Sequence, residues 1–395
     1  MSNSLRFASI SDRLNGLGGA KWALHFEGRR RASTGEPMTF LSIGEPDLPP
    51  PAAVVDTAID SLKRGRIGYA SGQGTPQALR AVANHLSRRS GRLVSEQEVM
   101  TANGTQHALY LAMNTVAEIG DEVLVADPYY ASYEAVVASS GATFVAVPTF
   151  PEDRFHLRAD VLEAAVTSRS RALLLNSPSN PTGAVLTLTE IDAIGEVCER
   201  HNLWIISDEV YASLTFDRPF VSPFDRPHLA GRTIAAASIS KSHAVPGFRT
   251  GWLGGPPDAI RRMTLVSETT SFGSQPFLGD ALAVALNDEH PEAQKLKHTF
   301  AERGRAVEQT FRGSTACTGR MPEGGMFVMA DIRPTGLSGE QFAWRLIEEH
   351  GVVVMPGESF GPGGSGHLRI ALTIDTPQLI VACQKIRALA EQLAV

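Results

Sequence analysis

The sequence predicts an α/β protein with a large, mostly parallel central sheet and a smaller C-terminal α/β unit. Between residues 100 and 255, short apolar runs rich in β-branched side chains alternate with stretches whose apolar residues recur at helical spacing. Strands and helices in alternation favour a parallel sheet that is covered by helices on both faces. The chain has 395 residues, of which 43% are hydrophobic, so it can bury one or two sizeable cores.

The expected strands of the large sheet are apolar runs of five or six residues, at 122–126, 143–147, 171–176, 203–207 and 233–238. One connecting segment carries Ile191, Ile194, Val197 and Cys198 at the spacing of a helix face. The region from 291 onward differs, because a long charged helical stretch precedes strand-like runs at 326–332, 352–355 and 368–372, with a helix near 342–349.

We therefore expect three parts: an N-terminal segment 1–44, a large unit 45–290 and a small unit 291–395. The N-terminal segment has no obvious place in the parallel sheet and could pack with either unit; we expect it to pack with the small one. The sequence shows no internal repeat and no low-complexity linker between the two units.

Composition excludes several classes of protein. The net charge of -6 comes from 36 basic and 42 acidic residues spread along the chain, so nucleic acid is not an expected partner. The short basic run at 29–31 is better explained as a solvated helix end than as a binding patch. No apolar stretch approaches the roughly 18 residues that a membrane span needs, so no membrane association is expected.

The cysteines and the N-terminus predict where the protein acts. Cys198, Cys317 and Cys383 are odd in number and far apart, which argues against a disulfide framework and against a zinc site. No metal ligand set is visible, so we expect no metal. The first ten residues lack a basic region followed by an apolar one, so secretion is not indicated and a cytoplasmic protein is expected.

Polar side chains follow three of the predicted strands where each strand ends. In an open parallel sheet, ligands gather at the carboxyl ends of the strands. Taken singly, each has a plain explanation: a turn, a helix cap or a surface lysine. Together they form one set of functional groups at one rim: Asn180, Asp208, Tyr211, Ser238, Ser240, Lys241 and Arg249.

This set matches the needs of one cofactor, pyridoxal phosphate. The cofactor requires an amine for its aldehyde, an anion at its ring nitrogen, donors at its phenolate oxygen and a cup for its phosphate. A carboxylate that keeps the pyridine nitrogen protonated lets the ring accept electrons from the α-carbon of the substrate. We therefore expect a pyridoxal phosphate enzyme.

The residues also carry a family resemblance. The run Ser238-Ile-Ser-Lys241 through Gly247-Phe-Arg-Thr-Gly-Trp252 resembles the cofactor-lysine motif of class I and II aminotransferases. Asn180-Pro-Thr-Gly183 and Asp208-Glu-Val-Tyr211 are similar to two further strand-end motifs of that family, and matches extend from Gly44-Glu-Pro-Asp47 to Gly357-Glu-Ser-Phe-Gly361 and Arg369. The resemblance covers nearly the whole chain and implies the fold type I of pyridoxal phosphate transferases, with 45–290 binding the cofactor.

The resemblance implies a role for each residue. Lys241 would hold the cofactor through its amine and then move the proton between the substrate α-carbon and the cofactor carbon. Asp208 would pair with the pyridinium, while Asn180 and Tyr211 would bond the phenolate oxygen. The phosphate would be held by Ser238, Ser240 and Arg249 together with the backbone amides of Gly104, Thr105 and Gln106. That trio precedes an apolar helical stretch, and a helix N-terminus favours phosphate, although Gly104 could also be a simple turn.

Two tyrosines resemble aromatic positions of the family. Tyr130 falls where the family stacks an aromatic ring on the cofactor, and many members have Trp there. Tyr69 resembles the tyrosine that reaches the phosphate of the neighbouring subunit, which implies a homodimer with shared active sites. Ordinary packing at a sheet or subunit surface is the alternative for both.

Substrate binding is implied at Arg369, Gly44 and Asn180. Arg369 lies where the family binds the substrate α-carboxylate, and its planar guanidinium suits bidentate binding; Gly44 would add a backbone contact. Gly361-Pro-Gly363-Gly-Ser-Gly366 fits the dinucleotide pattern G-x-G-x-x-G, but a strand-like run follows it instead of a helix. We interpret it as a flexible loop beside Arg369.

The resemblance implies transamination between an amino acid and a 2-oxo acid by a ping-pong route through pyridoxamine phosphate. A lyase, a decarboxylase or an amino-acid oxidase would share the same residues. A transcription regulator would need an added DNA-binding domain, for which no room precedes Gly44, and a nicotinamide dehydrogenase is the unrelated alternative.

Substrate specificity is predicted from finer features. No basic residue lies between Val266 and Leu282, the region that supplies a second arginine in some dicarboxylate-specific relatives, which disfavours aspartate. The block 324–338 and Lys241-Ser-His-Ala244 look most like arginine:pyruvate aminotransferases. The implied donor is arginine or another guanidino-bearing amino acid, and the implied acceptor is pyruvate or another 2-oxo acid. Val245-Pro246 replaces the Met-Thr common in the family, which leaves the exact substrate open.

Overall fold

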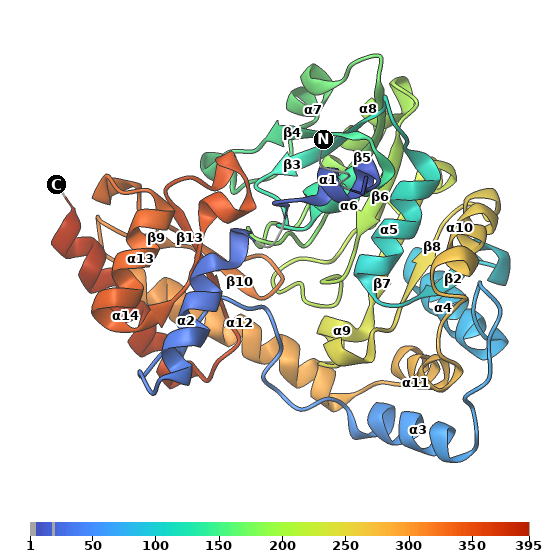
Figure 1. The fold of residues 1–395 in the computed structure, drawn as a ribbon, viewed down its shortest axis with the longest axis horizontal. Coiled ribbons are helices and arrows are strands. Elements are labelled where there is room, and N and C mark those ends of the chain that lie inside the picture. Colours follow the sequence, from blue (N-terminus) through green and yellow to red (C-terminus); the bar gives the residue numbers. More distant parts are fainter. Residues whose placement is uncertain (1–4, 18–19, 395) are drawn as a thin grey trace.

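The computed structural model describes residues 5–17 and 20–394, and Figure 1 shows a large unit with a central sheet beside a smaller C-terminal unit. The main sheet has the strand order β2-β8-β7-β6-β5-β3-β4. Neighbours from β7 to β4 run parallel, whereas β8 runs antiparallel to both β2 and β7, so the expected mostly parallel sheet is confirmed. The strands are Val99–Ala102 (β2), Glu122–Asp127 (β3), Thr143–Pro148 (β4), Ser170–Asn176 (β5), Trp204–Asp208 (β6), Thr233–Ser238 (β7) and Gly251–Gly254 (β8).

Both faces of this sheet are buried under helices, because apolar side chains point to both sides of each central strand. In β5, Ala172 and Leu174 pack in one cluster with α5, α6 and α10, while Leu173 and Leu175 pack on the other face with α7 and α8. The helices of this unit are Ala52–Lys63 (α3), Pro76–Ser90 (α4), Thr105–Val116 (α5), Tyr133–Ser140 (α6), Ala159–Ala165 (α7), Leu188–Arg200 (α8), Ile239–Ser242 (α9), Pro257–Thr270 (α10) and Pro276–Asn287 (α11).

Helix α8 shows how the local sequence sets an element. Thr187 caps its N-terminus in a reciprocal pair with Glu190, which satisfies backbone donors that the first turn leaves unpaired. The apolar residues at helical spacing, Ile191, Ile194, Val197 and Cys198, are all buried against the sheet, as their spacing predicts.

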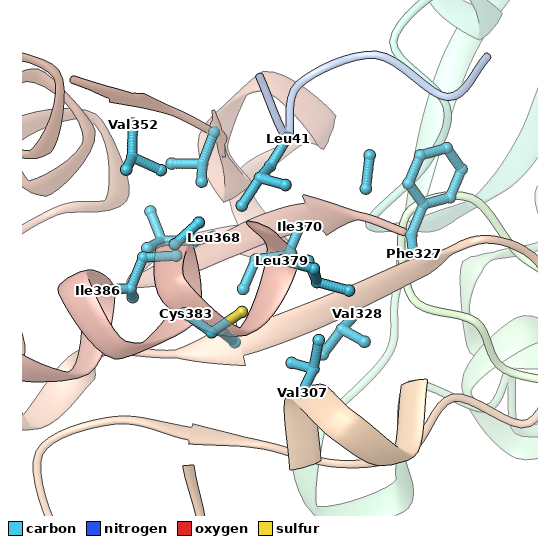
Figure 2. Close-up of a cluster of buried hydrophobic side chains, with 14 of the residues drawn as sticks. Leu41, Val307, Phe327, Val328, Val352, Leu368, Ile370, Leu379, Cys383 and Ile386 are labelled. Atoms are coloured by element: carbon cyan, nitrogen blue, oxygen red, sulfur yellow. The ribbon is translucent and has the colours of Figure 1, made fainter. Parts of the chain in front are cut away.

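The C-terminal unit packs a small antiparallel sheet against helices. Its strand order is β12-β13-β10-β9, and the buried side chains between this sheet and its helices are drawn in Figure 2, with Phe327, Val328 and Ile370 from the sheet and Leu379, Cys383 and Ile386 from α14. The elements are Pro291–Phe311 (α12), Thr318–Gly319 (β9), Phe327–Asp331 (β10), Gly339–His350 (α13), Val352–Val353 (β11), Met355–Pro356 (β12), His367–Ala371 (β13) and Thr376–Leu393 (α14). Helix α12 begins at residue 291, where the sequence predicts the small unit to begin. The division of the chain into domains stays a prediction.

The N-terminal segment contacts both units. Helix α1 (Ser9–Leu14) lies along α6, and Arg13 donates to the carbonyl oxygen of Ala138 at 3.1 Å. Helix α2 (Ala23–Ser33) and β1 (Thr39–Phe40) pack on the C-terminal unit, where β1 pairs with β11, and Figure 1 shows α2 beside α13. Residues 1–4 and 18–19 of the segment, and residue 395 of the small unit, lie outside the described residues. None of the helices in the described ranges combines the length and apolar character that crossing a bilayer needs.

Candidate active site

A cavity of about 350 Å³ opens at the carboxyl ends of the central strands. Most of the residues singled out from the sequence line it: Gly44, Thr105, Gln106, Tyr130, Asn180, Asp208, Tyr211, Ser238, Ser240, Lys241, Arg249 and Arg369. Gly104 lies just behind this wall, against the side chain of Arg249. The sequence positions are far apart, so the sheet is what brings the side chains together.

Strand topology explains this convergence. Strands β5, β6 and β7 are neighbours and run parallel, so the segments that follow them leave the sheet at the same edge. The register pairs Asn176 with Asp208, and Ser238 ends the next strand. Arg249 precedes β8 instead of following it, but β8 is antiparallel to β7, which brings its amino end to that edge as well.

Asp208 is a buried carboxylate at the floor of the cavity. The Tyr133 hydroxyl donates to its Oδ2 at 2.7 Å, and the backbone N–H of Val210 donates to Oδ1 at 3.2 Å. Burial raises the pKa of Asp208 to about 6, and the hydrogen bond from Tyr133 opposes that rise. A protonated ring nitrogen is the kind of cation that such a desolvated carboxylate would hold.

The opposite end of the cavity offers donors to an anion. Thr105, the first residue of α5, donates from its hydroxyl to Ser238 at 2.9 Å, and the unpaired N–H groups of the first turn of α5 lie at the same place. Arg249 forms no ion pair with a carboxylate among the described residues, and its Nη1 donates to the carbonyl of Pro246 at 2.9 Å. Gly104 has φ +80°, a backbone conformation that residues with a Cβ rarely adopt, and it lies against the end of the Arg249 side chain.

Lys241 reaches into the cavity from α9, directly after β7. Its Nζ donates to the carbonyl oxygen of Gly44 at 2.6 Å. Burial lowers the pKa of Lys241 to about 8; Glu45 opposes this, and Arg249 and Arg369 add to it. An amine with this pKa is neutral often enough near pH 8 to act as a nucleophile or a base.

Arg369 is a buried cation that lacks an acidic partner among residues 5–17 and 20–394. It is 1% exposed, and its guanidinium carbon lies 4.1 Å and 4.5 Å from the ring centroids of Phe327 and Phe360. Nη1 donates to Asn180 Oδ1 at 3.0 Å and Nη2 donates to the carbonyl of Ser42, but Nε finds no acceptor in the described chain. Burial lowers its pKa to about 10. A buried cation with a free donor fits a carboxylate ligand.

The structure also adds residues that the sequence did not indicate. Trp22, Ile43, Asn176 and Tyr133 line the cavity. Tyr133 lies three residues after Tyr130, outside any motif, and no sequence pattern points to its bond with Asp208. Trp22 and Ile43 come from the N-terminal segment, which had no predicted place beside the sheet.

Two further predictions concern residues outside the cavity. Tyr69 does not line the cavity of its own chain; it is 91% exposed, and its ring packs edge to face with that of Phe272 at 5.2 Å. The glycine-rich run 361–366 forms a short 3-10 turn that leads into β13, so it does not open a helix as a dinucleotide motif would. Its Gly363 N–H donates to the carboxylate of Asp127, 3.0 Å away.

These groups fit pyridoxal phosphate. The cavity presents one amine, one buried carboxylate at one end and hydroxyl, backbone and guanidinium donors at the other, which is the set that the aldehyde, ring nitrogen and phosphate of this cofactor require. Asn180 and Tyr211 both line the cavity, so an amide and a hydroxyl are present that could donate to a phenolate oxygen. The Nε of Arg369 is a buried donor without an acceptor in the described chain.

Comparisons with known proteins agree with this chemistry. The family model "Aminotransferase class I and II" matches residues 36–386. Arginine–pyruvate transaminase from Pseudomonas aeruginosa is 40% identical over 98% of this chain and 99% of its own length. The structure of aspartate aminotransferase from Thermus thermophilus with maleate superposes with a TM-score of 0.91 at 27% identity, covering 98% of this chain and 100% of that one. The aromatic aminotransferase of Pyrococcus horikoshii gives 0.87 at 30% identity, covering 92% and 99%.

The family model spans most of the chain, and the relatives match it almost end to end. Solved aminotransferases share its fold, which confirms the fold type I expected from the sequence. The chain is therefore a pyridoxal phosphate enzyme that transfers an amino group to a 2-oxo acid, and it belongs to the class I and II aminotransferases.

Proposed function

We propose that this aminotransferase takes the amino group of arginine, or of another amino acid with a guanidino group, and passes it to pyruvate or another 2-oxo acid. The similarity to arginine–pyruvate transaminase over nearly the whole chain supports this donor and acceptor. The observation on which the chemistry rests is that two groups line one cavity. One is the amine of Lys241, whose lowered pKa lets it lose its proton, and the other is the buried Arg369, whose Nε has no acceptor in the described chain.

Pyridoxal phosphate, when bound, supplies an aldehyde that condenses with amines and a ring that withdraws electrons from the substrate α-carbon. In our proposal Asp208 would keep the ring nitrogen protonated, and Asn180 and Tyr211 would donate to the phenolate oxygen. Tyr130 would lie against the ring. The phosphate would be held by the hydroxyls of Ser238 and Ser240, the guanidinium of Arg249 and the backbone amides of Thr105 and Gln106. The backbone N–H of Gly104, which the sequence also indicates, already donates to the carbonyl of Ala102 at 2.8 Å.

The substrate is oriented by Arg369 and moved through its reaction by Lys241. The guanidinium of Arg369 binds the α-carboxylate through Nε and one Nη, and the backbone at Gly44 adds a contact. Asn180, which already accepts from Arg369 Nη1, fixes the plane of the guanidinium. The amine of Lys241 would remove the α-proton of the bound amino acid and hold it on Nζ.

A panel of amino donors tests the proposed substrate. Each amino acid is added to the loaded enzyme with pyruvate, and the absorbance of the bound cofactor and the oxo-acid product are followed. We expect arginine to be the best donor. Release of ammonia, carbon dioxide or peroxide in place of an oxo acid and alanine would contradict amino transfer and indicate a lyase, decarboxylase or oxidase instead.

We further propose a homodimer in which Tyr69 reaches the phosphate in the neighbouring subunit. Tyr69 and Phe272 form an exposed aromatic pair, and Ile67, two residues before Tyr69 in the sequence, is 72% exposed. Exposed apolar residues grouped in this way favour a protein interface.

Light scattering of the loaded enzyme should give twice the chain mass of 42.3 kDa. Tyr69→Phe should weaken cofactor binding, and mixing Tyr69→Ala subunits with Lys241→Ala subunits should restore activity, because each hybrid dimer contains one complete site. A fully active monomer would refute shared sites.

We also propose a cytoplasmic site of action, with which the buried free thiols of Cys198, Cys317 and Cys383 are compatible. Cell fractionation tests this localisation.

A further inference from the structure

Some residues that line the cavity have no role in binding the cofactor or the substrate carboxylate. They include Trp22 and Ile43, which come from the N-terminal segment and not from the sheet. Trp22 ends a short 3-10 turn (Ala20–Trp22) ahead of α2. Its ring centroid lies 5.9 Å from the guanidinium carbon of Arg369. An amino acid whose carboxylate is bound at Arg369 therefore starts its side chain close to this ring.

The segment that carries Trp22 is attached to both the large unit and the C-terminal unit. The adjacent Lys21 forms an ion pair with Glu134 of α6 at 2.7 Å, which ties the segment to the large unit. The carbonyl oxygen of Lys21 accepts a hydrogen bond from Ser359 of the C-terminal unit at 3.0 Å, and the Trp22 side chain packs in a cluster with Phe360. A ring fixed in this way is a preorganised wall, which costs little further ordering when a ligand binds.

The charges that line the cavity offer a cationic side chain no ion-pair partner. Three cations, Lys241, Arg249 and Arg369, line the cavity, and the sole carboxylate among its described lining residues is Asp208, which would pair with the cofactor nitrogen in our proposal. A cationic side chain therefore finds no spare carboxylate in this subunit's wall, but it does find the face of an indole. Tryptophan is the strongest of the aromatic side chains at binding cations over its face, and a planar guanidinium can stack on it.

We propose that Trp22 is a specificity-determining residue: its ring face binds the side chain of the donor amino acid and selects long side chains that end in a planar cation. This inference deepens the proposed function and rests on it. Trp22 holds the side chain and takes no part in proton transfer, so its removal changes which donor is used more than how fast the reaction can run.

The test compares donors that differ only where Trp22 acts. Arginine has a planar cation, citrulline has a planar neutral group at the same position, and alanine has only a methyl group, with no planar or charged group to stack on the ring. In Trp22→Leu, which keeps apolar bulk, we expect kcat/KM for arginine to fall about tenfold and the arginine-to-citrulline ratio to fall about fivefold. Alanine should stay within about twofold. Trp22→Phe should keep most of the ratio, and Trp344→Leu on α13, outside the cavity lining, serves as the matched control.

A binding measurement supplies a readout without turnover. 5-Guanidinopentanoate is arginine without its α-amino group, so it can bind but cannot donate an amino group. Its dissociation constant for the loaded enzyme, measured by calorimetry, should rise about fivefold in Trp22→Leu.

The outcomes separate this inference from the proposed function. If the wild-type enzyme prefers arginine but Trp22→Leu leaves the arginine-to-citrulline ratio unchanged, the role of Trp22 is wrong and the proposed substrate stands. Equal losses for arginine and alanine would show that Trp22 acts through Arg369 or through folding, which also overturns the inference. A wild-type enzyme that prefers aspartate or a neutral donor to arginine overturns both.

Discussion

Replacing Arg369 by lysine should weaken the binding of amino acids and spare the binding of amines that lack the carboxylate. Arg369 donates hydrogen bonds to Asn180 and Ser42, and its Nε has no acceptor in the described chain. A carboxylate bound through Nε and one Nη would therefore accept two charge-assisted hydrogen bonds. Lysine keeps the positive charge but can replace only one of them. A hydrogen bond to a charged group contributes about 1.5–3 kcal/mol, which corresponds to about a 10- to 150-fold loss of affinity.

The assay measures binding apart from turnover. α-Methylarginine has no α-hydrogen, so its dissociation constant can be read from the absorbance of the bound cofactor. Agmatine, which is arginine without the carboxylate, serves as the matched ligand and should bind Arg369→Lys within about threefold of the wild type. Arg369→Ala should lose more affinity for α-methylarginine than Arg369→Lys does. Unchanged binding of α-methylarginine, or an equal loss for agmatine, would remove Arg369 from the carboxylate site.

Three further predictions concern the cofactor end of the site. Lys241→Ala should keep the circular dichroism and melting behaviour of the wild type but lose at least about 10³-fold in turnover, because the removed amine serves proton transfer and not packing; a variant with a tenth of the activity would contradict its role. Because burial lowers the pKa of Lys241 to about 8 from its usual 10.5, about a tenth of the amine is neutral at pH 7, roughly 300-fold more than for an unshifted lysine. The rate at which the apoprotein binds pyridoxal phosphate should therefore rise with pH up to about 8 and then level off, whereas a rate that still rises tenfold per pH unit at pH 9 would show an unshifted amine. Tyr133→Phe removes the hydrogen bond to Asp208 Oδ2 and should weaken cofactor binding about 10- to 100-fold, with Tyr110→Phe as the control; equal affinities in a cofactor titration would refute the contribution of Tyr133.

The sequence predicts the central strands of the sheet well because their signals are local. Five predicted strands each end within one residue of the end of an observed strand: 122–126, 143–147, 171–176, 203–207 and 233–238. A short apolar run between two helical stretches is difficult to assign to anything but a strand. Strands β2 and β8 were missed. β8 is only Gly251–Gly254, with glycine at both ends, and its four residues lack the β-branched side chains by which strands are recognised.

The sequence also predicts the residues of the site that follow the strand ends, but not the other residues that line the cavity. Asn180, Asp208 and Lys241 could be placed together because parallel neighbouring strands end at one edge. The position of Trp22 depends on a contact between Lys21 and Glu134, which are 113 residues apart, and the bond from Tyr133 to Asp208 spans 75 residues. Contacts of this kind are set by tertiary packing and leave no periodic or motif pattern in the sequence.

The most direct test is to fix the cofactor chemically and find where it is attached. Borohydride is added to the enzyme loaded with pyridoxal phosphate, the protein is digested, and the modified peptide is sequenced by mass spectrometry. We predict that the label lies on Lys241 alone and that Asp208→Asn and Arg249→Ala each reduce the amount incorporated. A label on another lysine, or a protein that takes up no cofactor, would contradict the assignment of this cavity as the active site.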